Sequence, residues 1–282
     1  MFLIYNEYVN SILFFIFIFV LGTIVGSFIN VFIFRRATGM GMGGRSKCAS
    51  CGHTLRALDL IPVISFLLLG GKCRYCKTKI SSIYPLIEIG AGALFFLIGL
   101  VNTSILISFS VIPYSMFFIQ LVFWSLVFAT AVYDLKHLTI PNMWALSLTI
   151  IAIIYSAISN YGFGKNFLFS ILSGAIFFIF FFLIWLFSRG KWMGLGDAKL
   201  AFPLGVFLGI SKLFSAWALS FWTGAIIVLI YFSYEQIILA KGKRLSALGR
   251  PITMKSEVPF GPFLFLGSFL AFLGLVIPFS GI

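Results

Sequence analysis

Two aspartates at the ends of apolar runs are the residues of this chain best suited to acid–base chemistry. Asp134 lies in TAVYDLKHLTIPN and Asp197 in MGLGDAKL, in a sequence with only seven acidic residues. Two carboxylates that lie close together cannot both ionise easily, so such a pair shares a proton. One carboxylate can then activate a water molecule while the other protonates a departing group.

Each aspartate also has a plain structural interpretation. Asp197 could be the N-cap of the helix that follows it, accepting hydrogen bonds from the first free N–H groups. Asp134 could be an ordinary charge at the end of a helix, beside Lys136 and His137. The spacing of these residues does not by itself decide between a catalytic pair and two structural roles.

Small and basic residues around Asp197 are candidates for binding a substrate. Gly194 and Gly196 have no side chain, so an extended peptide could approach the backbone there. A peptide bond must be unwound from a helix before water can reach it, and a glycine-bordered loop offers room for that. Lys199 follows at the start of the next apolar run, and we count it among the same candidates.

Four cysteines form two C-x2-C pairs in the polar stretch after the first apolar run. Cys48 and Cys51 lie in KCASCGH, and Cys73 and Cys76 lie in GKCRYCK, with 21 residues between the pairs. Two such pairs can place four thiolates in a tetrahedron around a zinc ion, and nearby basic residues favour the thiolate form. Two disulfides or free thiols are the alternatives, although a reducing cytoplasm argues against disulfides. His53 could compete as a ligand.

The stretch between the two cysteine pairs, LDLIPVISFLLLGG, is too short to cross a membrane and too apolar for a solvated loop. We expect it to lie on the membrane surface or to pack against the helices. A bound zinc ion would then hold the loop as a rigid lid over the ends of the membrane spans.

The composition is that of an integral membrane protein. Of the 282 residues, 61% are hydrophobic and 10% are charged, against about 25% charged in soluble domains. Several apolar runs are long enough to cross the membrane as helices, whereas a β-barrel would show short alternating segments. We therefore predict an all-α polytopic membrane protein. Its first run has Arg35 and Arg36 after it and no basic residue before it, so we expect a retained helix and not a cleaved signal.

Eight membrane spans are predicted from these runs. They lie at 12–34, 84–101, 113–133, 143–159, 167–187, 199–211, 214–234 and 260–279. The sixth is short and holds Pro203, so it could be a half-helix, and the stretch 104–112 could lengthen the third span or lie in the interface. The predicted domains are the first span at 1–34, the zinc-binding loop at 35–83 and a helix bundle at 84–282.

Positive charge gathers on one side of these spans, which marks that side as cytoplasmic. It holds 18 of the 20 Lys and Arg residues, in loops 35–83, 134–142, 188–198 and 235–259 and at Lys199. Only Lys165 and Lys212 remain for the other side, where both termini then lie. Membrane orientation explains the net charge of +13, so we expect no nucleic-acid partner.

The same topology sorts the acidic residues. Asp134 and Asp197 fall at the cytoplasmic ends of spans, and Glu88 falls at helix depth. The other four lie in loops or at their borders: Glu7, Asp59, Glu235 and Glu257. Ionisable groups at membrane depth are costly and tend to face a cavity or a partner.

Five strings are spread along most of the chain. They are GSFINVFIFR at 26–35, SSIYPLIE at 81–88, YDLKHLTIPN at 133–142, MGLGDAKL at 193–200 and VPFGPFL at 258–264. Their order and spacing, together with the tetracysteine loop, resemble the type IV prepilin peptidase family. Members of that family are bifunctional membrane aspartyl peptidases of pilus, type II secretion and competence systems.

The resemblance implies cleavage of a prepilin or pseudopilin leader at the cytoplasmic face of the bacterial inner membrane. Cleavage would fall after a glycine and before the hydrophobic helix of the mature subunit, with Asp134 and Asp197 as the catalytic pair of the bundle at 84–282. The resemblance also implies methylation of the new N-terminal amine, with S-adenosylmethionine as the methyl donor. The tetracysteine form of the family is associated with both activities.

The methyl-donor site rests on the resemblance alone, because no glycine-rich nucleotide fingerprint is present. Glu88, at helix depth beneath the cysteine loop, is a candidate for binding the methyl donor or the amine of the substrate. Pairing with a basic residue such as Lys79 is the alternative.

Three other functions are weighed against this one. The nearest is a peptidase without methyltransferase activity. A proton-coupled transporter should show acids near the bilayer midplane and related halves of the chain, whereas Asp134 and Asp197 are predicted at one face and no repeat is seen. A non-enzymatic assembly component, organised by the zinc loop, would tolerate Asp197→Asn.

Overall fold

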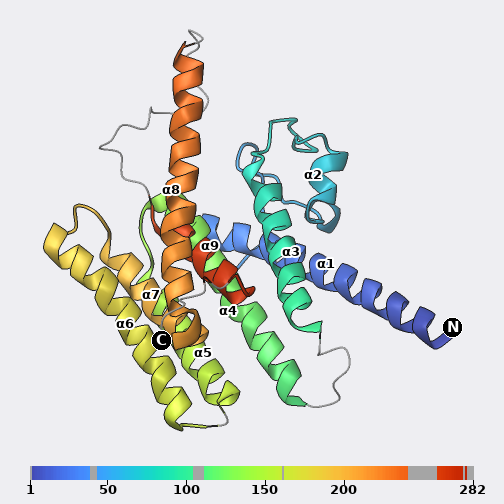
Figure 1. The fold of residues 1–282 in the computed structure, drawn as a ribbon. Helices are drawn as coiled ribbons and strands as arrows, with labels where there is room; N and C mark the ends of the chain where they lie inside the picture. Colours follow the sequence, from blue (N-terminus) through green and yellow to red (C-terminus); the bar gives the residue numbers. More distant parts are fainter. Residues whose placement is uncertain are drawn as a thin grey trace. The chain divides into compact units, whose positions relative to one another are not determined.

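The computed structural model shows an all-helical protein and describes residues 2–38, 43–103, 111–160, 162–240, 259–275 and 277 (Figure 1). The predicted all-α class is confirmed for this part of the chain. Predictions for Glu257, for the loop at 235–259 beyond residue 240 and for the stretch 104–112 up to residue 110 fall outside the described residues. The side chains of Glu7 and Glu235 are likewise not described.

Eight helices of the described chain have 12 residues or more. They are α1 (Phe2–Thr38), α3 (Ile83–Val101), α4 (Val111–His137), α5 (Asn142–Ser159), α6 (Lys165–Ser188), α7 (Leu195–Leu208), α8 (Ile210–Ala240) and α9 (Gly261–Phe272). Between α1 and α3 lie a 3-10 turn, η1 (Ala57–Asp59), and the short helix α2 (Ile64–Leu68).

The chain divides into two compact units, Met1–Ser125 and Leu126–Ile282. The first holds α1, the cysteine loop, α3 and the beginning of α4. The second holds the end of α4 and the helices α5 to α9. The four cysteines therefore belong to the first unit, and both aspartates belong to the second.

Within the described part of the chain, six helices are long and apolar enough to cross a membrane. They are Ser11–Arg36, Ile83–Val101, Tyr114–His137, Asn142–Ser159, Lys165–Ser188 and Ile210–Tyr234. The predicted sixth and eighth spans are also helical, but α7 has 14 residues and α9 has 12. Helices of that length extend about 21 Å and 18 Å, short of the roughly 30 Å of hydrocarbon. The structure supports a multi-pass membrane protein with six candidate spans, and the prediction of eight is not supported.

A glycine in a left-handed conformation ends each of the two short helices. Gly209, with a φ of 72°, separates α7 from α8, and Gly274, with a φ of 100°, follows α9. Glycine adopts this backbone at little cost, and the turn stops the helical hydrogen-bond pattern. The apolar run of the sequence continues through Gly209, which is why hydropathy predicts a span up to residue 211 there.

In the first unit, α1 and α3 pack closely through small residues. A Cβ on Gly22 of α1 would lie 2.6 Å from the carbonyl oxygen of Ala91 in α3. One turn further along, a Cβ on Gly26 would lie 2.7 Å from the Cα of Glu88. Glycines four residues apart let two membrane helices approach at backbone distance, and here they fix α3 beneath the cysteine loop.

In the second unit, α7 is the central helix and packs against α5, α6, α8 and α9. Ala198, Leu200 and Leu204 of α7 have no exposed surface. A Cβ on Gly205 would lie 2.8 Å from the Cα of Gly174 in α6, so these two helices touch through their backbones. A short helix enclosed by other helices can hold a polar residue at its N-terminus away from bulk water.

Candidate active site

Asp134 lies near the end of α4, and only 5% of the residue is exposed. Its Oδ2 accepts a hydrogen bond from the backbone N–H of Gly261, the first residue of α9, at 3.2 Å. The helix stops one turn later, where Leu138 has a φ of 53° and donates its N–H to the Asp134 carbonyl. The end of α4 and the beginning of α9 therefore hold this carboxylate between them.

Gly261 is a site residue that sequence reasoning did not single out. A Cβ at position 261 would lie 2.7 Å from Oδ2 of Asp134, so any side chain there would displace the carboxylate. The hydrogen bond comes from a backbone N–H, which cannot be predicted from the residue type. The only signal in the sequence was the position of Gly261 in the string VPFGPFL.

Asp197 is the third residue of α7 and not its N-cap. The N-cap is Gly194, so the capping interpretation places Asp197 wrongly. The carboxylate instead reaches back to a hydrogen bond with the backbone of Gly194, as an acid at the third helical position does in a capping box. Only 7% of Asp197 is exposed, because α7 is enclosed by its neighbours.

Asp197 lies outside the six candidate membrane spans, and its pKa reports on its surroundings. Burial raises the pKa, the negative charge of Asp134 raises it further, and the hydrogen bond from Gly194 offsets only part of this, so the pKa is about 7. The effect of the Asp134 charge on Asp197 shows that the two carboxylates lie close enough to interact. The structure thus brings the two predicted aspartates together.

The connection between α4 and α5 packs against the beginning of α7. A Cβ on Gly196 would lie 3.1 Å from the Cβ of Ile140, so the space beside this glycine is already filled. Beyond it, the Nζ of Lys199 donates a hydrogen bond to Oδ1 of Asn142 at 2.8 Å. Gly196 therefore allows close packing of the connection.

Gly194 differs from Gly196 in what surrounds it. A Cβ on Gly194 would meet only Oδ2 of Asp197 and the backbone nitrogen of Gly196, both at 3.8 Å. Gly194 is also exposed, whereas Asp197 is buried. Of the two predicted glycines, Gly194 is the one with open space directly beside the carboxylate.

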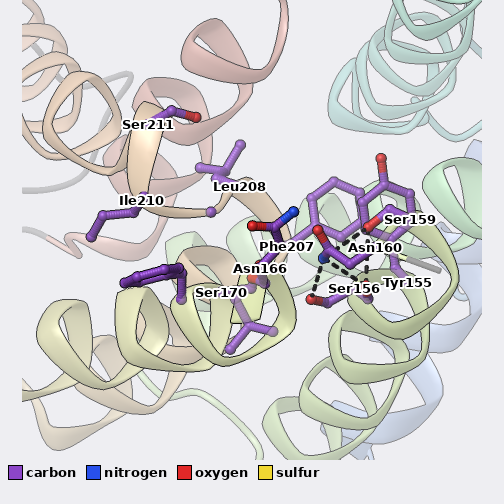
Figure 2. A pocket seen from close by; sticks show the side chains of 13 residues that line it. Tyr155, Ser156, Ser159, Asn160, Asn166, Ser170, Phe207, Leu208, Ile210 and Ser211 are labelled. Carbon is purple, nitrogen blue, oxygen red and sulfur yellow. Dashed lines mark hydrogen bonds between the residues drawn. The ribbon is translucent and has the colours of Figure 1, made fainter. Parts of the chain in front are cut away.

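A hollow of about 370 Å³ at the other end of α7 has a different chemical character. It is lined by serines, asparagines and apolar residues from α5, α6, α7 and α8, and none of its lining residues is charged. In Figure 2 the side-chain amide of Asn160 donates to the carbonyl and hydroxyl oxygens of Ser156 and lies against Ser159. This end of α7 offers no acid or base.

The four cysteine thiols of the first unit converge as the sequence predicted. Their Sγ atoms all lie within 4.8 Å of one another, and those of Cys48 and Cys76 are 3.9 Å apart. Zinc–sulfur bonds of about 2.3 Å in a tetrahedron place sulfur atoms roughly 3.8 Å apart, so the four thiols fit a zinc ion. Hydrogen bonds with the side chain and backbone of Thr78 lower the pKa of Cys76 to about 6. A hydrogen bond with the His53 backbone lowers the pKa of Cys51, but burial and the neighbouring thiols Cys48 and Cys76 outweigh it and raise this pKa to about 11.

Each cysteine pair sits in a tight turn of the same design. In the first, Cys48 N–H donates to the His53 carbonyl, and Gly52 after the second cysteine has a φ of 69°. In the second, Cys73 N–H donates to the Thr78 carbonyl, and Lys77 takes the corresponding place with a φ of 59°. The ring of His53 packs against that of Tyr75, with 3.7 Å between the ring centroids, and this contact links the two turns.

Asp59 ties the polar part of the loop together. Its carboxylate accepts hydrogen bonds from Arg74 Nε at 2.6 Å, from the Tyr75 hydroxyl at 3.2 Å and from the Arg56 backbone at 3.1 Å. Burial works to raise the pKa of Asp59, but the hydrogen bonds and the charge of Arg74 outweigh it and hold the pKa below its ordinary value. Asp59 is therefore a fully partnered structural acid.

Glu88 has a partner that neither sequence interpretation named. Its Oε2 accepts the backbone N–H of Val63 at 2.7 Å, and Glu88 is 8% exposed. Val63 has a φ of 61° and immediately precedes α2. Within the described residues the salt bridge is that of Arg74 with Asp59, so the suggested pair of Glu88 with Lys79 is not formed. The geometry shows Glu88 fastening the cysteine loop to α3.

Two families of known proteins match separate parts of the chain. Residues 20–101 match the Bacterial Peptidase A24 N-terminal domain, and residues 120–229 match the Type IV leader peptidase family. A protein from Dichelobacter nodosus, named Prepilin leader peptidase/N-methyltransferase, is 32% identical over 81% of this chain and 70% of its own length. The chain belongs to the type IV prepilin peptidase family.

Other relatives named Prepilin leader peptidase/N-methyltransferase also match most of this prepilin peptidase family member. One from Bacillus subtilis is 30% identical over 91% of this chain and 92% of its own length. One from Vibrio cholerae is 32% identical over 72% of this chain and 79% of its own length. No solved structure matches the chain. The protein is thus an enzyme of the A24 peptidase family built on membrane helices.

Proposed function

We propose that the protein cleaves the leader peptides of type IV prepilins or pseudopilins and then methylates the new N-terminal residue. The observation that carries the proposal is a pair of buried, electrostatically coupled carboxylates, Asp134 and Asp197, in a member of a leader peptidase family. The printed names of the relatives, which join the peptidase to an N-methyltransferase, support both activities.

In this proposal Asp134 is the base and Asp197 is the acid. The N–H of Gly261 stabilises Asp134 as an anion, and the charge of Asp134 helps to keep the proton on Asp197. Asp134 takes a proton from a water molecule, and the oxygen of that water attacks the carbonyl carbon of the glycine before the scissile bond. Asp197 then gives its proton to the leaving nitrogen as the C–N bond breaks.

The peptide approaches beside Gly194, where the geometry leaves space next to the carboxylate of Asp197. A larger side chain at this position would meet the incoming backbone before it reached the two acids. We place the reaction at the cytoplasmic face of the bacterial inner membrane, because the stretches 35–83, 134–142 and 188–198, which hold 12 of the 20 Lys and Arg residues, lie on one side of the six candidate spans.

Methylation would use S-adenosylmethionine, whose methyl carbon is attacked by the new amine with release of a proton and the thioether product. Zinc would be a structural ion held by Cys48, Cys51, Cys73 and Cys76, whose arrangement fits it. The methyl-donor site is not assigned, because Glu88, the candidate named from sequence, is engaged by Val63.

Incubation of the purified protein with a prepilin and methyl-labelled S-adenosylmethionine tests both activities at once. We expect a shorter product on gels and label in its N-terminal residue. A shorter product without label would support the peptidase-only alternative, and a prepilin that stays full length would overturn the proposal.

Metal analysis tests the zinc assignment. Wild type should bind about one zinc per chain, since four thiolates complete one tetrahedral site. The Cys48→Ser, Cys73→Ser double variant should bind little, because it removes one ligand from each turn. Ser50→Ala, a change within the first turn that leaves the thiols intact, is the matched control. Equal zinc in the double variant and the wild type would rule out the site.

A further inference from the structure

The short helix α2 of the cysteine loop has an apolar side that the described residues of the first unit leave uncovered. Ile64, Leu67 and Leu68 are three or four positions apart, so they share one side of the helix. They are 53%, 69% and 81% exposed. The segment directly before α2 adds three more exposed apolar side chains. We call all six the α2 surface: Leu58, Leu60, Ile61, Ile64, Leu67 and Leu68.

The rest of α2 is fixed to the second cysteine turn. A Cβ on Gly71 would lie 3.0 Å from Cζ of Phe66, so the ring of Phe66 packs against the chain that follows α2. The N–H of Gly71 donates to the Phe66 carbonyl, and the Gly71 carbonyl accepts the N–H of Ile80. The α2 helix is therefore a firm part of the loop, while the α2 surface stays available for a partner.

The beginning of α2 is held beside a membrane span. The N–H of Val63, directly before α2, donates to Oε2 of Glu88 at 2.7 Å, and Figure 1 shows α2 beside the beginning of α3. Glu88 is five residues beyond Ile83, where the candidate span begins, which is about 7.5 Å along the helix axis. Amphipathic helices bury their apolar side about 5–10 Å into the boundary of headgroups and acyl chains. The Glu88 contact therefore places α2 at the depth of that boundary.

The loop around α2 is strongly basic. Residues 43–82 hold seven Lys and Arg residues and one acid, Asp59, which forms a salt bridge with Arg74. A zinc ion with four thiolates has about two negative charges in excess, so the loop stays positive with the metal bound. Basic segments next to a span are attracted to anionic lipids. An apolar surface in a basic loop is thus complementary to an anionic lipid leaflet.

Two lysines lie opposite each other shortly after α2. Lys72 faces Lys79 in an antiparallel bridge, so both side chains are on the same side and their charges repel each other. Both lysines are exposed, and within the described chain neither forms a salt bridge. A phosphate group between the two ammonium groups would remove the repulsion. The first cysteine turn has the same bridge with one lysine only, between Lys47 and Thr54.

We infer that α2 inserts its apolar surface into the adjacent membrane leaflet, and that Lys72 and Lys79 bind the phosphate of an anionic phospholipid beside it. The sequence predicts that this stretch lies on the membrane surface or packs against helices, and the exposure of the α2 surface supports the first of these. The cysteine loop is then attached to the bilayer by α2 as well as by the spans on either side. The inference does not depend on the proposed reaction.

The accessibility of a spin label in lipid nanodiscs tests the insertion. Since the cysteines form the metal site, the label is attached to a ketone-bearing amino acid at position 68 of the full chain. In nanodiscs of phosphatidylcholine and phosphatidylglycerol, we expect dissolved oxygen to relax this label more than a water-soluble nickel chelate does. A label at Leu86, which is 64% exposed on the candidate span of α3, should respond in the same way. A label at Thr54 should respond more to the chelate.

Two results would overturn the insertion. A label at position 68 that responds mainly to the nickel chelate would place α2 in water. A label that responds to neither reagent would place α2 under protein, either the second unit of this chain or another molecule. Zinc content shows that each labelled protein is folded.

A photoactivatable phosphatidylglycerol in the same nanodiscs tests the two lysines. It should label residues 56–82 of wild type. The Lys72→Gln, Lys79→Gln double variant should reduce this labelling by about fivefold per lysine, because each basic residue near the surface adds to the attraction for anionic lipid. Lys47→Gln is the matched control and should reduce the labelling by less than about twofold. An equal loss per lysine in the control, or no loss in the double variant, would refute the assignment of Lys72 and Lys79.

Discussion

Buried carboxylates occur in both units of the molecule, and their partners differ. In the first unit, Asp59 accepts three hydrogen bonds, and the one from Arg74 is also a salt bridge. Glu88 accepts the N–H of Val63. In the second unit, Asp134 accepts the N–H of Gly261. Among the described residues, the hydrogen-bond partner found for Asp197 is the Gly194 backbone, and the charge of Asp134 acts on it.

The difference decides what each acid can do. A carboxylate saturated by a guanidinium and a hydroxyl stays ionised and fixes a loop, because its charge is already compensated. A carboxylate without a basic partner, beside a second carboxylate, keeps a proton that it can give away. The residue type is the same in both units, and the partners determine whether it is structural or reactive.

The largest expected effect is on cleavage. Asp134→Asn or Asp197→Asn should lower the cleavage rate by about 10³-fold or more, because loss of one member disables an acid–base pair. Asp59→Asn should leave cleavage within a few-fold of wild type. The measurement is the initial rate of leader removal, with zinc content as the check that each variant is folded. Rapid leader removal by Asp134→Asn or Asp197→Asn would show that the acids of the second unit are not the reactive pair.

The second effect is the pH dependence of cleavage by wild type. Since Asp197 must be protonated to act as the acid and its pKa is about 7, the rate should fall about tenfold for each pH unit above that value. A pH profile of kcat/KM measures it, with Asp59→Asn expected to show the same profile. A rate that still rises at pH 9 would exclude Asp197 as the acid.

The third effect is on stability and has opposite signs in the two units. The pKa of Asp197 is raised from 3.8 to about 7 on folding, so the stability it contributes is present below pH 3.8 and lost as pH rises through 7. The pKa of Asp59 is lowered, so its contribution is present above 3.8 and lost as pH falls through the folded pKa.

Two variants should therefore respond to pH in opposite directions. Asp197→Asn should gain a few degrees in melting temperature relative to wild type between pH 5 and pH 8. Asp59→Asn should melt below wild type at pH 7, and the deficit should shrink as the solution is made acidic. Thermal unfolding in detergent at several pH values gives the melting temperature of each variant relative to wild type. If both differences change with pH in the same direction, the partners of the two acids do not determine their effect on stability.

The smallest effect concerns Glu88. Glu88→Ala leaves the N–H of Val63 without its partner, which costs about 1–3 kcal/mol and loosens the cysteine loop. Zinc should leave the variant faster when a chelator is added, while leader cleavage continues. Glu88→Gln keeps an oxygen acceptor, so its rate of zinc release should lie between those of Glu88→Ala and wild type. Unchanged zinc release together with lost methylation would instead assign Glu88 to the methyl-donor site.

Much of the site could be predicted because it depends on rare side chains. With seven acids in a chain of 282 residues, topology and elimination leave Asp134 and Asp197, and two C-x2-C pairs specify four convergent thiols. Both predictions rest on side-chain chemistry that the apolar background makes conspicuous. The all-α fold follows from the same composition.

Contacts made by the backbone could not be predicted in this way. Gly261 reaches Asp134 across 127 positions with an N–H that every residue except proline carries, and Val63 reaches Glu88 in the same manner. The sequence predicted that the sixth apolar run is short, as α7 is, but not whether it crosses the membrane. Hydropathy measures apolar character and does not distinguish a helix buried in protein from one that crosses lipid. The break at Gly209 depends on a backbone angle.

The close approach of Gly261 to Asp134 makes the tolerance of one position conditional on the other. Alanine at 261 would displace the carboxylate, because its methyl group would lie 2.7 Å from Oδ2 of Asp134. In a chain that already has alanine at 134, that obstacle is gone, and the second substitution adds little damage to the first. The effects of substitutions at the two positions should therefore be non-additive, although the positions are 127 residues apart in the sequence.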